Sequence, residues 1–115
     1  LGLRREVAQV HVAEPVLHYI LALVAAIRGH AALAQPVSPR VGISLYKCSR
    51  AAAFLAGRDF VVPDDVKGLL GNVVHHRLVL KPEAESDGRA REAVIHAALG
   101  TVAVPKGVDN SPGSE

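Results

Sequence analysis

The chain has 115 residues, a length typical of one domain, and half of its residues are hydrophobic. Aromatic residues make up only 3%, and Met and Trp are absent, so the core must be built mainly from Ala, Val, Leu and Ile. The formal net charge of +2 comes from scattered basic and acidic residues, and no basic run is interleaved with aromatic residues. The charge is therefore weak evidence for a nucleic-acid partner.

Cysteine use and hydropathy indicate the cellular setting. The single Cys48 cannot form an internal disulfide, which is compatible with a reducing cytoplasm. The longest apolar run, residues 19–27, is far shorter than the roughly 20 residues that span a bilayer, and no signal peptide is recognisable. We therefore expect a cytoplasmic chain with no membrane contact. Because the sequence starts at Leu1 and contains no Met, we also expect it to be a piece of a longer protein.

Residues 1–13 are expected to lead into the domain as an edge strand or an extended segment, because Val10 and Val12 alternate with polar neighbours. A first amphipathic helix is predicted from residue 14 to Arg28, with Gly29 as its C-cap. Its apolar stripe recurs at helical spacing and comprises Val16, Leu17, Ile20, Leu23, Val24 and Ile27. Residues 30–37 are expected to form a loop.

The second helix is predicted to run from about Pro39 to Ala56. Ser38 is a suitable N-cap, because its hydroxyl can accept a hydrogen bond from an unpaired first-turn N–H. Pro39 suits the first helical position, where its missing donor costs nothing. The expected core stripe comprises Val41, Leu45, Cys48, Ala52 and Leu55, while Arg40, Ser44 and Lys47 lie on another face.

Two further helices and two short β-like runs complete the predicted fold. The third helix begins at residues 63–65 (Pro-Asp-Asp), where proline is permitted and acids are favoured by the helix dipole. The runs at residues 60–62 and 78–80 are expected to pair with each other across it. The fourth helix is predicted from about Arg89 to Leu99, and residues 105–115 are expected to form a disordered tail. The predicted fold class is all-α, with four helices and at most short strand pairs at helix ends.

The sequence offers few residues for catalysis or metal binding. It contains no GxxxxGK[ST] phosphate loop, no HExxH, no CxxC and no EF-hand pattern. His75 and His76 are adjacent and diverge by about 100° on a helix, so they are not expected to share a metal. Asp64 and Asp65 are explained by the helix start. We expect neither enzymatic activity nor a bound cofactor from this chain alone.

Arg40 is the candidate binding residue. It lies in the first turn of its helix, where the macrodipole disfavours a cation. Aimed outward from a helix start that Ser38 and Pro39 hold, its guanidinium could serve as a fixed fork for phosphate oxygens. On spacing alone, a solvated first-turn arginine is the simpler interpretation.

Three stretches together resemble one family: residues 37–40 (VSPR), residues 57–67 (GRDFVVPDDVK) and residues 76–85 (HRLVLKPEAE). They are similar to the C-terminal helical lid of MoxR-type AAA+ ATPases, and the resemblance covers roughly residues 10–105. It implies that residues 14–104 form an AAA+ lid domain and that residues 1–13 lead in from an ATPase core. It also implies that Arg40, positioned by Ser38 and Pro39, is the sensor 2 residue that contacts the γ-phosphate of ATP. Two departures concern local geometry: Pro36-Val37 before the Ser-Pro-Arg motif, and Ala13 where the family uses Ser or Asp as a cap.

The resemblance further implies the activity of the parent protein. It would bind ATP with magnesium in its core domain, form a ring with neighbouring subunits, and act as a chaperone that matures or activates protein complexes. Proteins carrying von Willebrand factor A domains are the implied partners. Two alternatives stay open: the lid of a magnesium-chelatase-like subunit, and a stand-alone helical interaction or nucleic-acid-binding module that uses Arg40, Lys47, Arg50 and Arg58. An upstream GxxxxGK[ST] loop would favour a lid, and salt-sensitive binding of DNA or RNA would favour the module.

Overall fold

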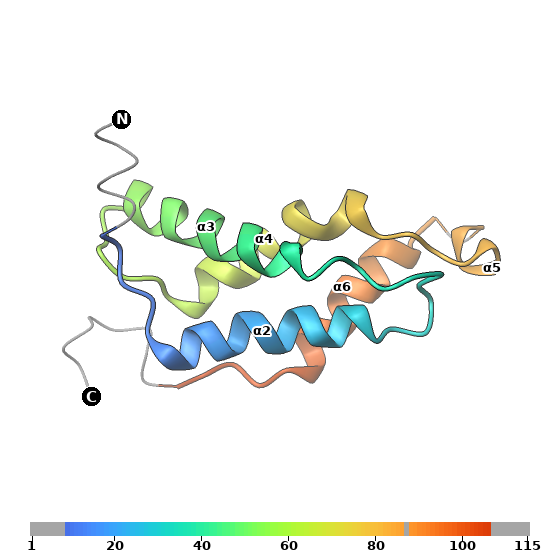
Figure 1. Ribbon diagram of the computed structural model, residues 1–115, viewed down its shortest axis with the longest axis horizontal. Coiled ribbons are helices and arrows are strands. Elements are labelled where there is room, and N and C mark those ends of the chain that lie inside the picture. Colours follow the sequence, from blue (N-terminus) through green and yellow to red (C-terminus); the bar gives the residue numbers. More distant parts are fainter. Residues whose placement is uncertain (1–8, 87, 107–115) are drawn as a thin grey trace.

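Helices make up the architecture in the computed structural model, which describes residues 9–86 and 88–106. Over these ranges the chain forms α2 (Glu14–Arg28), α3 (Arg40–Leu55), α4 (Pro63–Val74), the 3-10 turn η1 (His75–Arg77), α5 (Pro82–Glu85) and α6 (Ala90–Thr101), and no strand (Figure 1). The all-α prediction is confirmed. The single turn α5 lies between the run at residues 78–80 and the fourth predicted helix, where no helix was predicted. Of the predicted lead-in (residues 1–13) and the predicted tail (residues 105–115), residues 1–8 and 107–115 lie outside the described residues.

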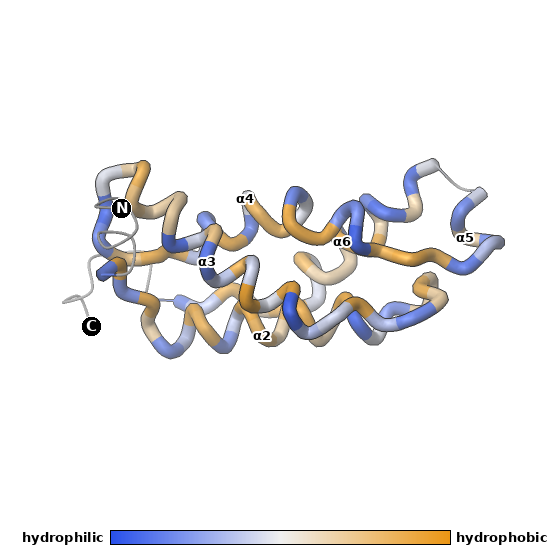
Figure 2. Tube along the Cα trace, turned by 45° about the horizontal axis from the view of Figure 1, so that its top comes forward, coloured by the Kyte–Doolittle hydropathy of each residue, from blue (hydrophilic) through white to orange (hydrophobic). Residues whose placement is uncertain are grey.

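The core lies between α2, α3, α4 and α6. α3 packs against α4 and α2, and α2 also packs against α6. Hydrophobic and hydrophilic residues alternate along these helices at intervals of about one turn, as amphipathic helices require (Figure 2). Leu23 of α2 and Leu45 of α3 are fully buried, as their spacing predicted. Burial of such apolar side chains is the main favourable contribution to folding.

The buried face of α3 differs from the predicted stripe. Its buried residues are Val41, Leu45, Ser49 and Ala53. Cys48 is exposed and Leu55 has 77% of its surface exposed, so assigning them to the core was wrong. Residues four apart in an α-helix point in directions that differ by about 40°. A buried face that repeats every four residues therefore winds around α3. The prediction had followed apolarity alone and therefore missed that a small serine fills the buried position beside Cys48.

The two β-like runs do not pair with each other. Phe60 forms an isolated parallel bridge with His11, and Leu80 forms an isolated antiparallel bridge with Leu33. The predicted pairing of residues 60–62 with 78–80 was therefore wrong. The cause is length: α4 has 12 residues and is about 18 Å long, which carries the two runs to opposite ends of the helix. Short pairs at helix ends do occur, each with a loop instead of with the other run.

Candidate functional site

The loop before α3 sets up the start of that helix. Arg28 at the end of α2 donates from Nε to the carbonyl oxygen of Val37 at 2.9 Å, and Val37 itself is buried. Pro39 has helical angles (φ −59°, ψ −17°), although the first full helical residue is Arg40. The Ser38 hydroxyl accepts a hydrogen bond from the Arg40 backbone N–H at 3.2 Å. The hydrogen bond predicted for the Ser38 hydroxyl is present. Pro39, predicted at the first helical position, occupies the N-cap position instead, because α3 begins one residue later at Arg40.

The Arg40 side chain is exposed at this helix start. The first turn of α3 contains no acidic residue, and among the described residues the Arg40 guanidinium has no hydrogen bond or ion pair. Its backbone is fixed while its side chain is available. A planar, permanently charged group in this position suits an anion supplied from outside the chain.

An apolar groove lies between α2 and the first two turns of α3, and it reaches Pro39, the neighbour of Arg40 in the chain. Its volume is about 470 Å³, and it is lined by Leu17, Ile20, Leu21, Pro39, Gly42, Ile43, Tyr46 and Lys47. Leu21 and Ile43 are 55% and 56% exposed. Leu17 is 37% exposed, so it faces this groove more than the core stripe in which the sequence placed it. The groove was not predicted from the sequence, although apolar residues that lie off the predicted core stripes, such as Leu21 and Ile43, indicate it.

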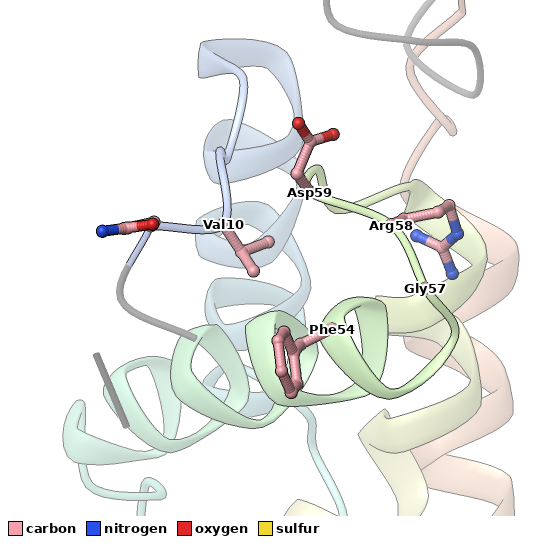
Figure 3. A pocket seen from close by; sticks show the side chains of 6 residues that line it. Val10, Phe54, Gly57, Arg58 and Asp59 are labelled. Carbon is pink, nitrogen blue, oxygen red and sulfur yellow. The ribbon is translucent and has the colours of Figure 1, made fainter. Parts of the chain in front are cut away.

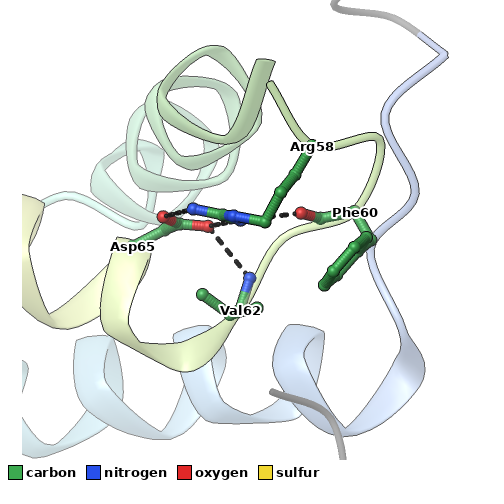
Figure 4. Close-up of polar contacts among 4 residues, drawn as sticks. All are labelled: Arg58, Phe60, Val62 and Asp65. Carbon is green, nitrogen blue, oxygen red and sulfur yellow. Dashed lines mark hydrogen bonds and ion pairs between the residues drawn. The ribbon is translucent and has the colours of Figure 1, made fainter. Parts of the chain in front are cut away.

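A second polar cluster lies at the other end of α3, in the turn that leads to α4 (Figure 4). Arg58 donates to both carboxylate oxygens of Asp65, at 2.9 and 2.7 Å, and to the carbonyl oxygen of Phe60 at 2.9 Å. Asp65 also accepts from the backbone N–H of Val62 at 2.9 Å. We call these four residues the Arg58 cluster. The hydrogen bonds that Arg58 donates to Asp65, together with the negative charge of that carboxylate, raise the pKa of Arg58.

The Arg58 cluster explains part of the Pro-Asp-Asp motif. Asp65 accepts from the amide that precedes the helix, which satisfies a donor that α4 itself cannot use. Asp64 is exposed and forms a longer contact of 3.9 Å with Lys67. The sequence predicted that both acids favour the helix start, but it did not predict that Asp65 would pair with Arg58, seven positions before it. Arg58 is therefore committed within the domain instead of available to phosphate.

A second cavity, about 630 Å³ in volume, adjoins this cluster (Figure 3). It is lined by Gln9, Val10, Phe54, Gly57, Arg58 and Asp59. Its charged groups are Arg58, which bonds Asp65, and Asp59, which is exposed. The lining brings together no nucleophile with a base, so this cavity offers no recognisable chemistry.

The comparisons with known proteins agree with this geometry. A family model described as AAA lid domain matches residues 25–98. The chain belongs to the AAA lid domain family. It is related to the MoxR family of AAA+ ATPases: it is 41% identical over 69 residues to Chaperone MoxR1 of Mycobacterium tuberculosis, a match covering 60% of this chain and 18% of that protein. It is 38% identical over 103 residues to the protein YeaC of Bacillus subtilis, covering 90% of this chain and 32% of YeaC.

A solved structure resembles the lid domain over the same extent. The crystal structure of a candidate ATPase from Cytophaga hutchinsonii superposes with a TM-score of 0.83 and 31% sequence identity, covering 90% of this chain and 34% of that one. The lid domain thus spans about a third or less of the length of these relatives.

In the part of the chain that the structure describes, no group of three His, Cys, Asp or Glu side chains is placed to hold a metal ion. His75 lies in η1 and approaches Glu92 of α6 at 3.5 Å. Every described helix is too short or too polar to cross a bilayer.

Proposed function

We propose that this lid domain, residues 14–104, closes over ATP held by a nucleotide-binding core in the same protein, and that Arg40 acts as its sensor 2 arginine. The observation that carries the proposal is the Arg40 side chain: it is exposed, without a described partner, and fixed at its backbone by Ser38 and Pro39. The positive end of a helix disfavours a cation, and the γ-phosphate would supply the missing negative charge. The planar guanidinium of Arg40 can then distinguish ATP, which has a γ-phosphate, from ADP, which lacks it.

The groove beside Arg40 supports the same proposal. Two leucines and an isoleucine with large exposed fractions are unusual next to a charged site in an isolated domain, and they fit a surface that another domain covers. When the lid closes, this surface and Arg40 would be covered together. Water would be excluded from the phosphate contact, which strengthens it.

In the whole protein we propose an ATP-dependent chaperone of the MoxR type. MoxR1 of Mycobacterium tuberculosis is named a chaperone, and the shared lid makes the same activity the natural proposal here. The core would hold ATP with magnesium, and neighbouring subunits would complete a ring. Proteins with von Willebrand factor A domains are the proposed partners, on the resemblance alone.

The nucleic-acid-binding alternative receives less support. Of its four basic residues, Arg58 is bonded to Asp65, and Arg50 lies over the Tyr46 ring with its guanidinium carbon 5.2 Å from the ring centre. Arg40 and Lys47 are exposed on α3. Two cations give a weak, strongly salt-dependent contact with nucleic acid. We expect no measurable DNA or RNA binding by this chain at physiological salt.

The decisive experiment compares Arg40→Ala and Arg40→Lys in the longer parent protein with Lys67→Ala, which removes an exposed cation on α4. A charge-assisted hydrogen bond is worth about 1.5–3 kcal/mol, so Arg40→Ala is expected to reduce ATP hydrolysis about 10- to 100-fold. ADP affinity should change little, because ADP lacks the γ-phosphate. Lysine should restore only part of the rate, since it lacks the planar fork.

The 115-residue chain provides the matching stability control. Arg40→Ala should leave its unfolding free energy within about 0.5 kcal/mol, as for other surface changes. The wild-type chain should give no heat on titration with ATP and magnesium, because one arginine makes too few contacts to offset the cost of association. If Arg40→Ala unfolds the chain while the parent variant hydrolyses ATP normally, Arg40 is a structural residue and the proposal is wrong.

A further inference from the structure

The segment that leads into α2 is bonded to the turn between α3 and α4. The His11 backbone N–H donates to the carbonyl oxygen of Asp59 at 2.8 Å, and the Val61 N–H donates to the carbonyl oxygen of His11 at 2.9 Å. Val10, just before this bridge, is 5% exposed and belongs to the core. The incoming chain is therefore attached to the domain before its first described helix begins.

The turn that receives this segment is itself held from both sides by the Arg58 cluster. Arg58 precedes Asp59 and bonds the carbonyl of Phe60, while Asp65 bonds the amide of Val62. The bidentate ion pair between Arg58 and Asp65 joins the two sides (Figure 4). The side chain of Asp65 is 9% exposed and that of Arg58 is 27% exposed, so the pair is largely shielded from water. Shielded, bidentate pairs of this kind hold a definite geometry.

We infer that Arg58 and Asp65 are positioning residues: they hold residues 59–61 in the conformation that binds His11, so that the chain from Val10 onward moves with the lid as one rigid body. Any pivot of the lid then lies on the N-terminal side of Val10. The inference depends on the two backbone hydrogen bonds of His11 and on the four bonds of the cluster, all of which lie within the described residues.

The consequence for Arg40 follows from the length of α3, and this step rests on the proposed function. Arg40 and Leu55 are at opposite ends of the helix, about 22 Å apart along its axis. A tilt of about 10° at the attached end would therefore displace Arg40 by about 4 Å, whereas phosphate contacts tolerate errors of only about 0.5 Å. A fixed attachment would let domain closure bring Arg40 to one position reproducibly.

Amide hydrogen exchange, measured by NMR on the 115-residue chain, tests the inference without ATP. In the wild type, the amides of His11, Val61 and Val62 should give the same opening free energy and the same urea dependence once each exchange rate is divided by its intrinsic rate, because one opening releases all three. Arg58→Lys removes the fork, and Asp65→Asn removes the charge but keeps an oxygen for the Val62 amide. Each variant should speed exchange at His11 and Val61 at least tenfold relative to amides in the middle of α2 and α3.

Two variants act as controls. Arg91→Lys alters another partly buried arginine, which contacts Glu85 and the carbonyl of Leu78, and should leave exchange at His11 unchanged. Arg40→Ala should also leave it unchanged, so failure of the sensor proposal would not affect this test. Unequal opening free energies at the three amides of the wild type would overturn the inference. So would a folded Arg58→Lys or Asp65→Asn variant in which His11 and Val61 exchange no faster than the rest of the core.

Discussion

Two leucines of α3 provide a sharp test of the core. Leu45 is fully buried, whereas Leu55, ten positions further along the same helix, is 77% exposed. Truncation of leucine to alanine removes three carbon atoms, worth about 2.4 kcal/mol at about 0.8 kcal/mol each when they are buried. The cavity left behind raises the expected cost of Leu45→Ala to about 2–5 kcal/mol.

For Leu55→Ala the same calculation gives a small effect. Only about a quarter of that side chain's surface is buried, so the loss is about 0.5 kcal/mol by the same transfer scale. The slightly better helix propensity of alanine reduces it further. Cys48→Ser, at the other exposed position that the sequence had placed in the core, should likewise change stability by less than about 0.5 kcal/mol.

Urea unfolding followed by far-UV circular dichroism measures these differences. With a slope of about 2 kcal/mol per molar urea, the middle of the usual range, Leu45→Ala should lower the midpoint by about 1–2.5 M and Leu55→Ala by less than about 0.3 M. If Leu45→Ala is unfolded without urea, Leu45→Val, which should cost about 1 kcal/mol, replaces it. Equal losses at Leu45 and Leu55 would refute the assignment of the buried face.

Three further predictions concern polar groups and glycines. Ser49→Ala should raise the unfolding free energy by up to about 1 kcal/mol in urea titrations, because the buried hydroxyl of Ser49 has no described partner. Gly68→Ala should stabilise by about 0.5–1 kcal/mol, since an added Cβ meets nothing within 4 Å, whereas Gly57→Ala should destabilise, because Gly57 has a φ of +83°. Burial and the charge of Asp64 raise the pKa of Tyr19 in the folded domain. The unfolded chain therefore loses the Tyr19 proton at lower pH than the folded domain, and stability should fall as pH rises above about 10. Tyr19→Phe should reduce that fall in thermal melts at increasing pH.

Helical periodicity predicted most of the fold. The bounds of α2 match the prediction, because its apolar residues recur without interruption and Gly29 follows its last turn. α3 also begins and ends within one residue of the predicted range, since Ser38, Pro39 and Gly57 mark its ends chemically. These signals are local: each depends on residues within about one turn of the helix end.

Most of what the sequence did not predict involves contacts between different elements of the fold. Which face of α3 is buried depends on where α4 and α2 lie, so apolarity at Cys48 and Leu55 was misleading. The partners of the short β-like runs depend on the length of α4. The ion pair between Arg58 and Asp65 forms because Gly57, at φ +83°, turns the chain back after α3. The sequence contains all three residues but no local signal that they meet.

The candidate site was predictable in its residues but not in its surroundings. Ser38, Pro39 and Arg40 were selected from helix-start chemistry and from the family resemblance, and the structure places Arg40 on the surface. The apolar groove beside it could not be predicted, because it forms between two helices whose packing angle no local pattern encodes. Leu21 and Ile43, on different helices, come together only in the folded domain.

Arg40 and Arg58 illustrate how the surroundings of an arginine separate structure from function. Arg58 makes three hydrogen bonds within the domain and is largely shielded from water, so its contacts stabilise the fold. Among the described residues the Arg40 guanidinium has no hydrogen bond or ion pair, and it lies at the end of a helix dipole that opposes its charge. The polar contacts of the folded domain therefore do not explain an arginine at position 40. Under the proposed function, the γ-phosphate of ATP supplies the missing negative charge, and the core domain that carries it covers the apolar groove.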